Sequence, residues 1–414
     1  MSHDCGSEQG LLSLDAALAA YARELAPLPV QRVPLEAARA QVLAAAVVAT
    51  VDLPTYAQSA VDGYALHAAD LAGASSAQPV RLPVIGEVRA GFAPDAPLSR
   101  GAALRIFTGG RMPLGADTIV RQEIVQRDGS DALFVAPLEV GTDLRLRGEE
   151  LQAGTTLAET GQRLDSGLLA ALAMAGVTQV ETYTPPRVTL LVTGDEVGKA
   201  GDAGVFDANG PLVRSWFAER GYAAPVTQYV VDDEAQLRAA LSAALDSSDL
   251  VLTTGGVSVG DHDLVRPVAS KLGVREVFWQ VAQKPGKPLY FGVREHDGHR
   301  SVLLGLPGNP GAVVIGLHIH VATALARLQG LSSETPGWRY GRLMAPVRAD
   351  SREQLLRMRV VIDAEGQISL HKLGHQASHM LSNLAFADAL MRVPAGVALQ
   401  AGDSVRWLPL RWVA

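Results

Sequence analysis

Apolar residues recur at helical spacing near the N-terminus of the chain. The first run covers Leu14–Leu25, with Ser13 placed to cap its first turn, and Pro27 ends it. The same pattern predicts a second helix over Leu35–Val47. Between residues 79 and 135, short β-like runs separated by Gly and Pro are typical of a small β domain. Helical spacing returns at Ser166–Gly176, which indicates that this β domain is inserted into another domain.

From residue 187 to residue 328, strand patterns alternate with helix patterns. The predicted strands are Val188–Thr193, Val226–Val231, Leu250–Thr254 and Val302–Leu306, and the predicted helices are Pro211–Arg220, Glu234–Leu245 and Gly311–Leu328. Asn209 is placed to cap the first of these helices, and Gly221 to end it. The alternation predicts a mostly parallel sheet covered on both faces, which binds ligands beyond the carboxyl ends of its strands. From Arg339 onward the pattern is again β.

Composition narrows the function classes. The net charge is −7 and no basic block occurs, which argues against a nucleic-acid or membrane-surface binder. Cys5 is the single cysteine, so the chain forms no internal disulfide and no cysteine-rich zinc site. No apolar run reaches the roughly 18 residues of a membrane span, and no signal segment is visible, so a cytoplasmic protein is expected.

Glycine-rich loops follow the predicted strands and suit an anion. Such loops offer backbone N–H groups to a phosphate where a helix begins. The candidate phosphate-binding residues are Thr193, Gly194, Asp195, Gly255, Gly256, Ser258, Gly260, Pro307, Gly308 and Asn309. Taken alone, Gly255-Gly256 is better explained as a tight turn, and Asn309 with Pro310 as a helix start. Neither a Walker A loop nor a dinucleotide-binding fingerprint is present.

Charged residues lie beside these loops. The carboxylates at strand ends are Asp195, Glu196, Asp232, Asp261 and Asp263. Each one alone fits a solvated loop or a helix cap, the cap being the simplest role for Asp232. Several together beside a phosphate site suit Mg²⁺.

Two lysines form a second charged group. Lys284 and Lys287 are separated by Pro285-Gly286 and followed by Pro288, so both amines are held with little freedom. They suit a tetrahedral oxyanion, although a solvated surface turn would have the same sequence. His318 and His320 point to different faces of a helix and do not suggest a shared metal.

Nine motifs in order resemble one family. They are Ser-Ala-Val-Asp-Gly-Tyr-Ala (59–65), Ile-Phe-Thr-Gly (106–109), Arg-Leu-Arg-Gly-Glu-Glu (145–150), Thr-Gly-Asp-Glu (193–196), Val-Asp-Asp (231–233), Thr-Gly-Gly-Val-Ser-Val-Gly-Asp-His-Asp (254–263), Lys-Pro-Gly-Lys-Pro (284–288), Leu-Pro-Gly-Asn-Pro (306–310) and Gly-His-Gln-Ala-Ser-His-Met-Leu-Ser (374–382). The set is similar to the molybdopterin molybdenumtransferases, the MoeA-like proteins that include the gephyrin E domain. Each motif is weak alone, but the ordered set is specific.

The resemblance implies an enzyme that converts adenylylated molybdopterin and molybdate into molybdenum cofactor and AMP, with Mg²⁺. It also implies a multidomain α/β plus β fold. Its parts are N-terminal helices with the first part of an extended domain (1–52), an inserted small β domain (53–144), the second part of the extended domain (145–182), a three-layer α/β molybdopterin-binding domain (183–331) and a C-terminal β-barrel (336–414). The implied assembly is a homodimer with sites between subunits, so that Asp62 completes the site of the partner. Molybdopterin adenylyltransferase and cofactor-acceptor proteins are further partners that the resemblance suggests.

The family's functional residues match positions of this chain. The resemblance assigns Asp62, Thr108, Glu196, Asp232 and Asp263 to activity, Glu196, Asp232, Asp261 and Asp263 to the metal, and Lys284, Lys287, Pro288, Arg352 and Ser378 to molybdate. On the residues alone, Asp62-Gly63 is only a turn signal.

The chain departs from the family pattern at three positions. Glu150 replaces the usual Asp, Gln280 stands where some members have Lys, and Ala312 replaces a frequent Ser. Two other functions fit parts of the sequence: a molybdopterin adenylyltransferase, whose loop is usually Thr-Gly-Gly-Thr-Gly, and a non-enzymatic gephyrin-like scaffold. The preference for molybdate over tungstate is not set by these motifs.

Overall fold

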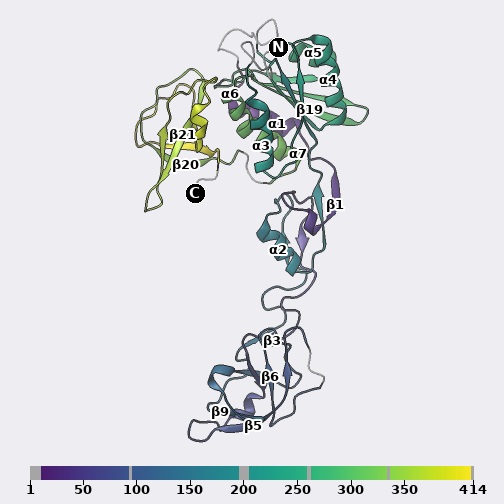
Figure 1. Ribbon diagram of the computed structural model, residues 1–414, viewed down its shortest axis with the longest axis vertical. Helices are drawn as coiled ribbons and strands as arrows, with labels where there is room; N and C mark the ends of the chain where they lie inside the picture. The colour runs from purple at the N-terminus through teal and green to yellow at the C-terminus, as the bar shows by residue number, and fades with distance from the viewer. Residues whose placement is uncertain (1–10, 93–95, 195–204, 259–262, 333–335, 412–414) are drawn as a thin grey trace.

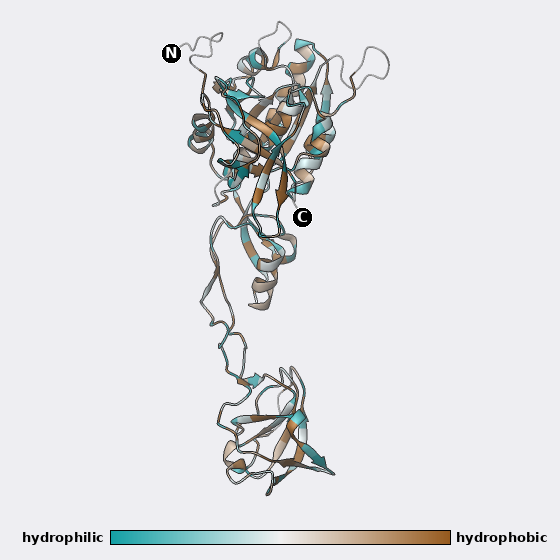
Figure 2. Cartoon of the chain, turned by 90° about the vertical axis from the view of Figure 1, so that its left-hand side faces the viewer, coloured by the Kyte–Doolittle hydropathy of each residue, from teal (hydrophilic) through white to brown (hydrophobic). Residues whose placement is uncertain are grey.

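The computed structural model describes residues 11–92, 96–194, 205–258, 263–332 and 336–411. The molecule is elongated, with a small β domain at one end and a larger head at the other (Figure 1). Hydrophobic residues are concentrated in the strands of the head (Figure 2).

A six-stranded sheet forms the centre of the head, in the order β14-β13-β15-β19-β18-β16. Its strands are β13 (Val188–Thr193), β14 (Val226–Val230), β15 (Leu250–Thr254), β16 (Arg275–Trp279), β18 (Tyr290–His296) and β19 (His299–Leu306). The first four strands in the sheet order are parallel, and β18 runs antiparallel to both of its neighbours, β19 and β16. The prediction of a mostly parallel sheet is confirmed.

Helices cover both faces of this sheet, because successive side chains of its buried strands point to opposite sides. They are α1 (Leu14–Glu24), α3 (Asn209–Glu219), α4 (Glu234–Ser247), α5 (Val265–Lys271), α6 (Pro310–Ile315) and α7 (Ala322–Leu328). Leu190 and Leu252 pack in the core formed with α1, α3, α6 and α7, whereas Leu191 and Val251 pack against α4 and α5.

The segment Pro310–Leu328 is one continuous helix whose middle, η4 (Gly316–Val321), is a π-helix. Among the described residues, it is the one helix long and apolar enough to cross a membrane, but 89% of its most apolar 18-residue stretch is buried. Its apolar character therefore reflects core packing.

The C-terminal region is a closed barrel. Its strands are β20 (Arg339–Leu343), β21 (Glu353–Ile362), β22 (Ile368–Lys372), β23 (Ala389–Val393) and β24 (Ser404–Pro409). The order β21-β22-β20-β24-β23 closes because β23 also pairs with β21. A short strand of the head, β17 (Gln283–Lys284), pairs with β21 and joins the barrel to the candidate oxyanion loop.

The distant β domain is a sheet in the order β7-β4-β6-β5-β9-β8. Its strands are β4 (Gly63–Leu66), β5 (Val80–Val88), β6 (Ala103–Ile106), β7 (Thr118–Arg121), β8 (Gln126–Asp128) and β9 (Asp131–Phe134). The outgoing and returning chain segments run side by side between it and the head (Figures 1 and 2). They pair as β1 (Val30–Pro34) with β12 (Gln179–Tyr183), β2 (Val47–Val48) with β11 (Thr156–Ala158), and β3 (Gln58–Ser59) with β10 (Leu144–Arg145). The helix α2 (Ser166–Met174) packs beside these pairs.

The helix predicted over Leu35–Val47 is wrong. Only the short 3₁₀-helix η1 (Leu35–Ala37) forms, and Ala40 then adopts a φ of +64° that breaks any helix. The backbone instead pairs with the returning segment, through Val42 with Arg163 and Leu43 with Thr182. Tertiary pairing has therefore overridden the helical propensity of this alanine-rich stretch.

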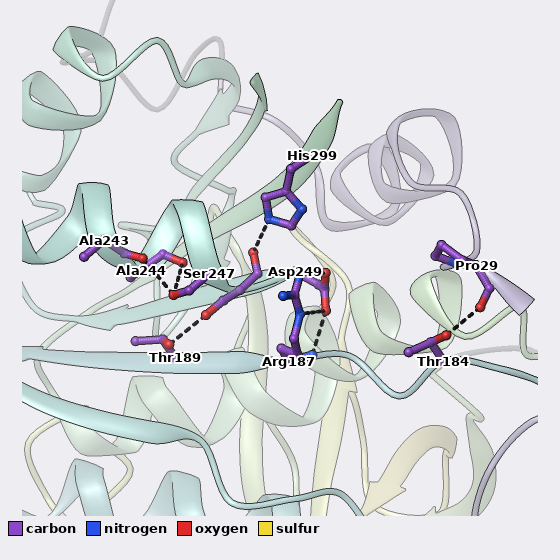
Figure 3. Close-up of polar contacts among 10 residues, drawn as sticks. Pro29, Thr184, Arg187, Thr189, Ala243, Ala244, Ser247, Asp249 and His299 are labelled. Carbon is purple, nitrogen blue, oxygen red and sulfur yellow. Dashed lines mark hydrogen bonds and ion pairs between the residues drawn. The ribbon is translucent and has the colours of Figure 1, made fainter. Parts of the chain in front are cut away.

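Polar side chains at the amino ends of the sheet strands bind one another (Figure 3). Asp249, just before β15, accepts hydrogen bonds from the backbone N–H of Arg187 at 2.8 Å and from its guanidinium at 2.9 and 3.1 Å. The hydroxyls of Thr189 and Ser248 lie 2.7 Å apart, and a ring nitrogen of His299 lies 3.0 Å from the Ser248 carbonyl. These contacts fix the edge of the sheet that is opposite to the candidate site.

Candidate functional site

The three glycine-containing loops meet at the carboxyl ends of the parallel strands. Gly194 N–H donates to the Val230 carbonyl at 3.2 Å, which ties the end of β13 to β14. Gly255 N–H donates to the Leu306 carbonyl at 2.9 Å, which ties the end of β15 to β19. The strand order changes direction between β13 and β15, the position at which open α/β sheets bind ligands.

Gly255 allows the loops to approach one another closely. Its φ is +99°, and a Cβ placed on it would lie 2.7 Å from the Thr193 hydroxyl and 3.1 Å from the Thr193 carbonyl. On the other side, a Cβ on Gly308 would lie 3.7 Å from the Gly255 Cα. Predicted phosphate-binding residues from three loops are thus brought into one place. Of the others, Ser258 is exposed beyond Gly256, whereas Asp195 and Gly260 lie outside the described residues.

Several buried polar atoms at this edge have no hydrogen-bond partner within the described part of the chain. They are the hydroxyl oxygens of Thr253 and Thr254 and the amide oxygen of Asn209. The amide nitrogen of Asn209 donates to the Gly308 carbonyl at 2.8 Å. The predicted capping role of Asn209 is therefore wrong: Asp207 accepts the hydrogen bond from Gly210 N–H at 2.8 Å, and Asn209 joins α3 to the glycine loops. Buried polar groups normally have hydrogen-bond partners, so these unpaired oxygens mark a place that suits a polar ligand.

Two of the predicted carboxylates belong to described segments that follow the strands next to β13. Asp232 is exposed after β14, and Asp263 is half-buried after β15. The cap that we assigned to Asp232 is instead made by Asp233, which accepts from Gln236 N–H at 2.8 Å. No group of three candidate metal ligands occurs among the described residues. The predicted ligands Glu196 and Asp261 lie outside them.

The lysine loop lies at the same edge of the sheet, because it precedes β18 and Tyr290 pairs with Gly305 of β19. The Lys284 side chain is 51% exposed, and its Nζ lies 2.6 Å from Oδ2 of Asp350. This hydrogen bond, with that from Arg352 N–H, lowers the pKa of Asp350. The Arg352 guanidinium reaches the Gln283 carbonyl at 3.5 Å. The structure thus brings Arg352 of the barrel to the lysine loop.

The start of α6 completes this region. Pro310 is the first helical residue, as predicted, and Asn309 precedes it without a side-chain capping bond. Gly311 N–H donates to the Ser378 carbonyl at 2.8 Å. The start of α6, which follows directly from Pro307, Gly308 and Asn309, therefore lies beside Ser378 and beside Gly286 of the lysine loop, where an added Cβ would be 3.8 Å from the Ala312 Cβ.

Asp62 and Thr108 form a separate pair on the distant β domain. Oδ1 of Asp62 accepts two hydrogen bonds at 2.8 Å, from the backbone N–H and the hydroxyl of Thr108. These bonds lower the pKa of Asp62 and keep it ionised. Within one chain, this domain lies at the far end of the molecule from the glycine and lysine loops (Figure 1). The pair is therefore not brought to the other predicted residues by its own subunit.

Several residues that support the lysine loop carried no sequence signal. Asp350 holds Lys284, and the buried side chains of Tyr21, Gln283 and His320 lie behind the loop. The guanidinium of Arg357 donates to the carbonyls of His375 and Ala377 at 2.9 and 3.0 Å and so holds the segment that carries Ser378. These contacts join residues far apart in the chain, and no local motif marks them.

Three family models match successive parts of the chain. Residues 12–176 match the MoeA N-terminal region (domain I and II), residues 189–327 a probable molybdopterin binding domain, and residues 340–410 the MoeA C-terminal region (domain IV).

Curated relatives and solved structures agree with these models. Molybdopterin molybdenumtransferase of a Nostoc species is 32% identical over 91% of this chain and 88% of its own length. The protein of that name from Haemophilus influenzae is 32% identical over 90% and 92%. The crystal structure of the molybdopterin biosynthesis MoeA protein from Pyrococcus horikosii matches 97% of this chain and 100% of its own, with 27% identity and a TM-score of 0.78. The ordered motifs, the fold and the placement of the loops therefore lead to one conclusion: the chain belongs to the molybdopterin molybdenumtransferase (MoeA) family.

Proposed function

We propose that this protein is a molybdenum insertase that converts adenylylated molybdopterin and molybdate into molybdenum cofactor and AMP. One observation carries the proposal: a phosphate-type cradle and a cationic oxyanion loop adjoin at one sheet edge. Gly308 lies against Gly255 of the cradle, and four residues later the Ala312 Cβ is 3.8 Å from a Cβ placed on Gly286 of the lysine loop. The names of the curated relatives support the same reaction.

In this proposal, the two regions divide the substrates between them. The glycine loops hold the phosphates of the adenylylated pterin, with the Thr253 and Thr254 hydroxyls and the Asn209 amide as further polar contacts. Lys284, Lys287 and Arg352 attract the molybdate dianion and hold it beside the pterin. Holding two reactants in one orientation is a large part of the rate acceleration in such transfers.

Magnesium suits the carboxylates of the cradle. Mg²⁺ is commonly bound by one or two carboxylates together with substrate phosphates, and Asp232 and Asp263 supply carboxylate oxygens on either side of β13. Bound there, the ion would neutralise charge on the phosphoanhydride as it breaks. Asp195, Glu196 and Asp261 belong to the same set by sequence.

The proposed assembly is a homodimer in which Asp62 and Thr108 complete the site of the partner subunit. Two observations support this arrangement: Thr108 is exposed and the half-buried Asp62 is held ionised, and the pair lies far from the cradle of its own chain. A complementation experiment tests it. Asp62→Asn and Lys284→Ala chains, each inactive at low molybdate, are mixed, dissociated and reassociated. Shared sites predict recovery of activity in the mixed dimers, and no recovery would contradict them.

The insertase reaction itself is tested by AMP release. The purified chain is incubated with adenylylated molybdopterin, Mg²⁺ and varied molybdate, and AMP is measured by chromatography. Release that rises and saturates with molybdate is expected. Molybdate-independent release, or pyrophosphate production from ATP and unmodified molybdopterin, would contradict the proposal, the latter in favour of the adenylyltransferase reaction.

A further inference from the structure

A chain of buried hydrogen bonds connects helix α1 to the lysine loop. The Tyr21 hydroxyl lies 3.1 Å from Nδ1 of His320, and Nε2 of His320 lies 3.0 Å from Oε1 of Gln283. Nε2 of Gln283 then donates to the Gly286 carbonyl at 2.9 Å. All three side chains are at most 1% exposed.

The Gly286 carbonyl fixes the direction of every bond in this chain. A carbonyl only accepts, so Gln283 must present its amide N–H to Gly286 and its oxygen to His320. His320 must therefore donate from Nε2, which leaves Nδ1 to accept from the Tyr21 hydroxyl. Burial lowers the pKa of His320 to about 3, which keeps the imidazole neutral, as this pattern requires.

These hydrogen bonds, from Tyr21 to Gly286, orient one peptide group of the lysine loop. The Gly286–Lys287 peptide is trans, so its N–H points away from its carbonyl. Because the carbonyl is held inward by Gln283, the Lys287 N–H is directed to the opposite side. In the described part of the chain, this N–H has no hydrogen-bond acceptor.

The position of His320 and the main-chain bonds of the loop also favour a part in orienting the loop. It lies in the π-helix η4, and single π-turns inside α-helices are uncommon and frequent at functional sites. The ends of the loop are also fixed by main-chain bonds: Val281 N–H donates to the Lys287 carbonyl at 3.0 Å, and Ala282 N–H to the Leu12 carbonyl at 2.8 Å. The one turn between them is held from within by Gln283.

We propose that Tyr21, His320 and Gln283 are positioning residues that hold the Lys287 backbone N–H, together with the lysine loop, toward the oxyanion. This inference rests on the proposed function, because it takes molybdate as the ligand of the loop. It adds a neutral backbone donor to the lysine side chains, and it gives the N-terminal helix a part in oxyanion binding.

The test uses Gln283→Leu, which removes the amide and keeps a similar volume. In the full-length protein, the molybdate concentration for half-maximal AMP release should rise about tenfold, as expected for one weakened hydrogen bond to an anion. The maximal rate and the half-saturating concentration of adenylylated molybdopterin should stay within about twofold of the native values. Tyr21→Phe, which removes only the outermost hydroxyl, should give a smaller shift in the same direction.

Thr323→Val is the matched control, because Thr323 is 2% exposed on the same long helix and its hydroxyl bonds only within that helix, to the Ile319 carbonyl. Hydrogen exchange of the Lys287 amide, measured with and without molybdate, separates a positioning role from a purely structural one. Molybdate should slow this exchange in the native chain and in Thr323→Val, and should slow it less in Gln283→Leu. Equal slowing in Gln283→Leu and in the native chain, or an unchanged molybdate requirement in Gln283→Leu, would overturn the positioning role. Absence of molybdate-dependent AMP release in the native chain would instead overturn the proposed function.

Discussion

The two edges of the central sheet differ in whether their polar side chains have hydrogen-bond partners. At the amino ends of the strands, Asp249, Arg187, Thr189 and Ser248 bind one another within 3.1 Å (Figure 3). At the carboxyl ends, the buried oxygens of Thr253, Thr254 and Asn209 have no hydrogen-bond partner among the residues that the structure describes. Both edges come from the same strands, so the difference does not reflect the elements themselves. One edge is stabilised by its own side chains, and the other has unpaired oxygens that the proposed substrates would bind.

Gly255→Ala should have the largest effect, and on function more than on stability. Its Cβ would come within 2.7 Å of the Thr193 hydroxyl at a φ of +99°, so the loops at the carboxyl edge would separate. AMP release should fall about 100-fold, which corresponds to a misplaced substrate. Gly273→Ala is the control, because Gly273 also has a positive φ but nothing within 4 Å of the added Cβ. Equal losses of activity in the two variants would mean that strain alone, and not the closeness of the loops, matters.

Lys284→Ala should act at the same edge but on one substrate only. Removing a cation from the oxyanion loop should raise the half-saturating molybdate concentration about 30-fold, within the range of a lost charge-assisted hydrogen bond. The requirement for adenylylated molybdopterin should change little. Lys271→Ala, which removes a surface lysine paired with Glu234, is the control. An unchanged molybdate requirement in Lys284→Ala would remove this lysine from the oxyanion site.

Asp249→Asn should give the reverse result at the amino edge. Asp249 is 7% exposed and accepts three hydrogen bonds from Arg187, so replacing its carboxylate should lower the free energy of unfolding by about 2 kcal/mol. Kinetic constants for both substrates should stay within about twofold of the native values. Denaturant unfolding and AMP release measured on the same preparation would check both parts. A change in molybdate or pterin requirement would show that the two edges are coupled.

The sequence predicts the loops at the carboxyl edge better than the buried residues that hold those loops in place. The strands, the glycine loops and Lys284–Pro288 are local patterns, and the sheet brings them together by a general rule of parallel strands. Errors arose where tertiary contacts override local propensity, as at Leu35–Val47, or choose between adjacent residues, as with Asp232 and Asp233. The hydrogen bond between Tyr21 and His320 joins residues that are 299 positions apart, and no spacing rule links residues at that distance in the sequence.

Asp350→Asn should have the smallest effect and the opposite sign to Lys284→Ala. Asp350 lies 2.6 Å from the Lys284 amine, so an incoming oxyanion competes with it for that charge. Neutralising Asp350 should lower the half-saturating molybdate concentration about threefold at low ionic strength, because exposed pairs are weak and screened by salt.

The pKa of Asp350 is lowered, so the ion pair is present above the ordinary carboxyl range and is lost only as the pH falls through the lowered pKa. The ratio between variant and native protein should therefore be constant from about pH 6 to pH 8. Asp363→Asn, in a barrel turn where the carboxylate accepts from Gln367 N–H, is the control. A weaker affinity for molybdate in Asp350→Asn would mean that the carboxylate orients Lys284 for the oxyanion and does not compete with it.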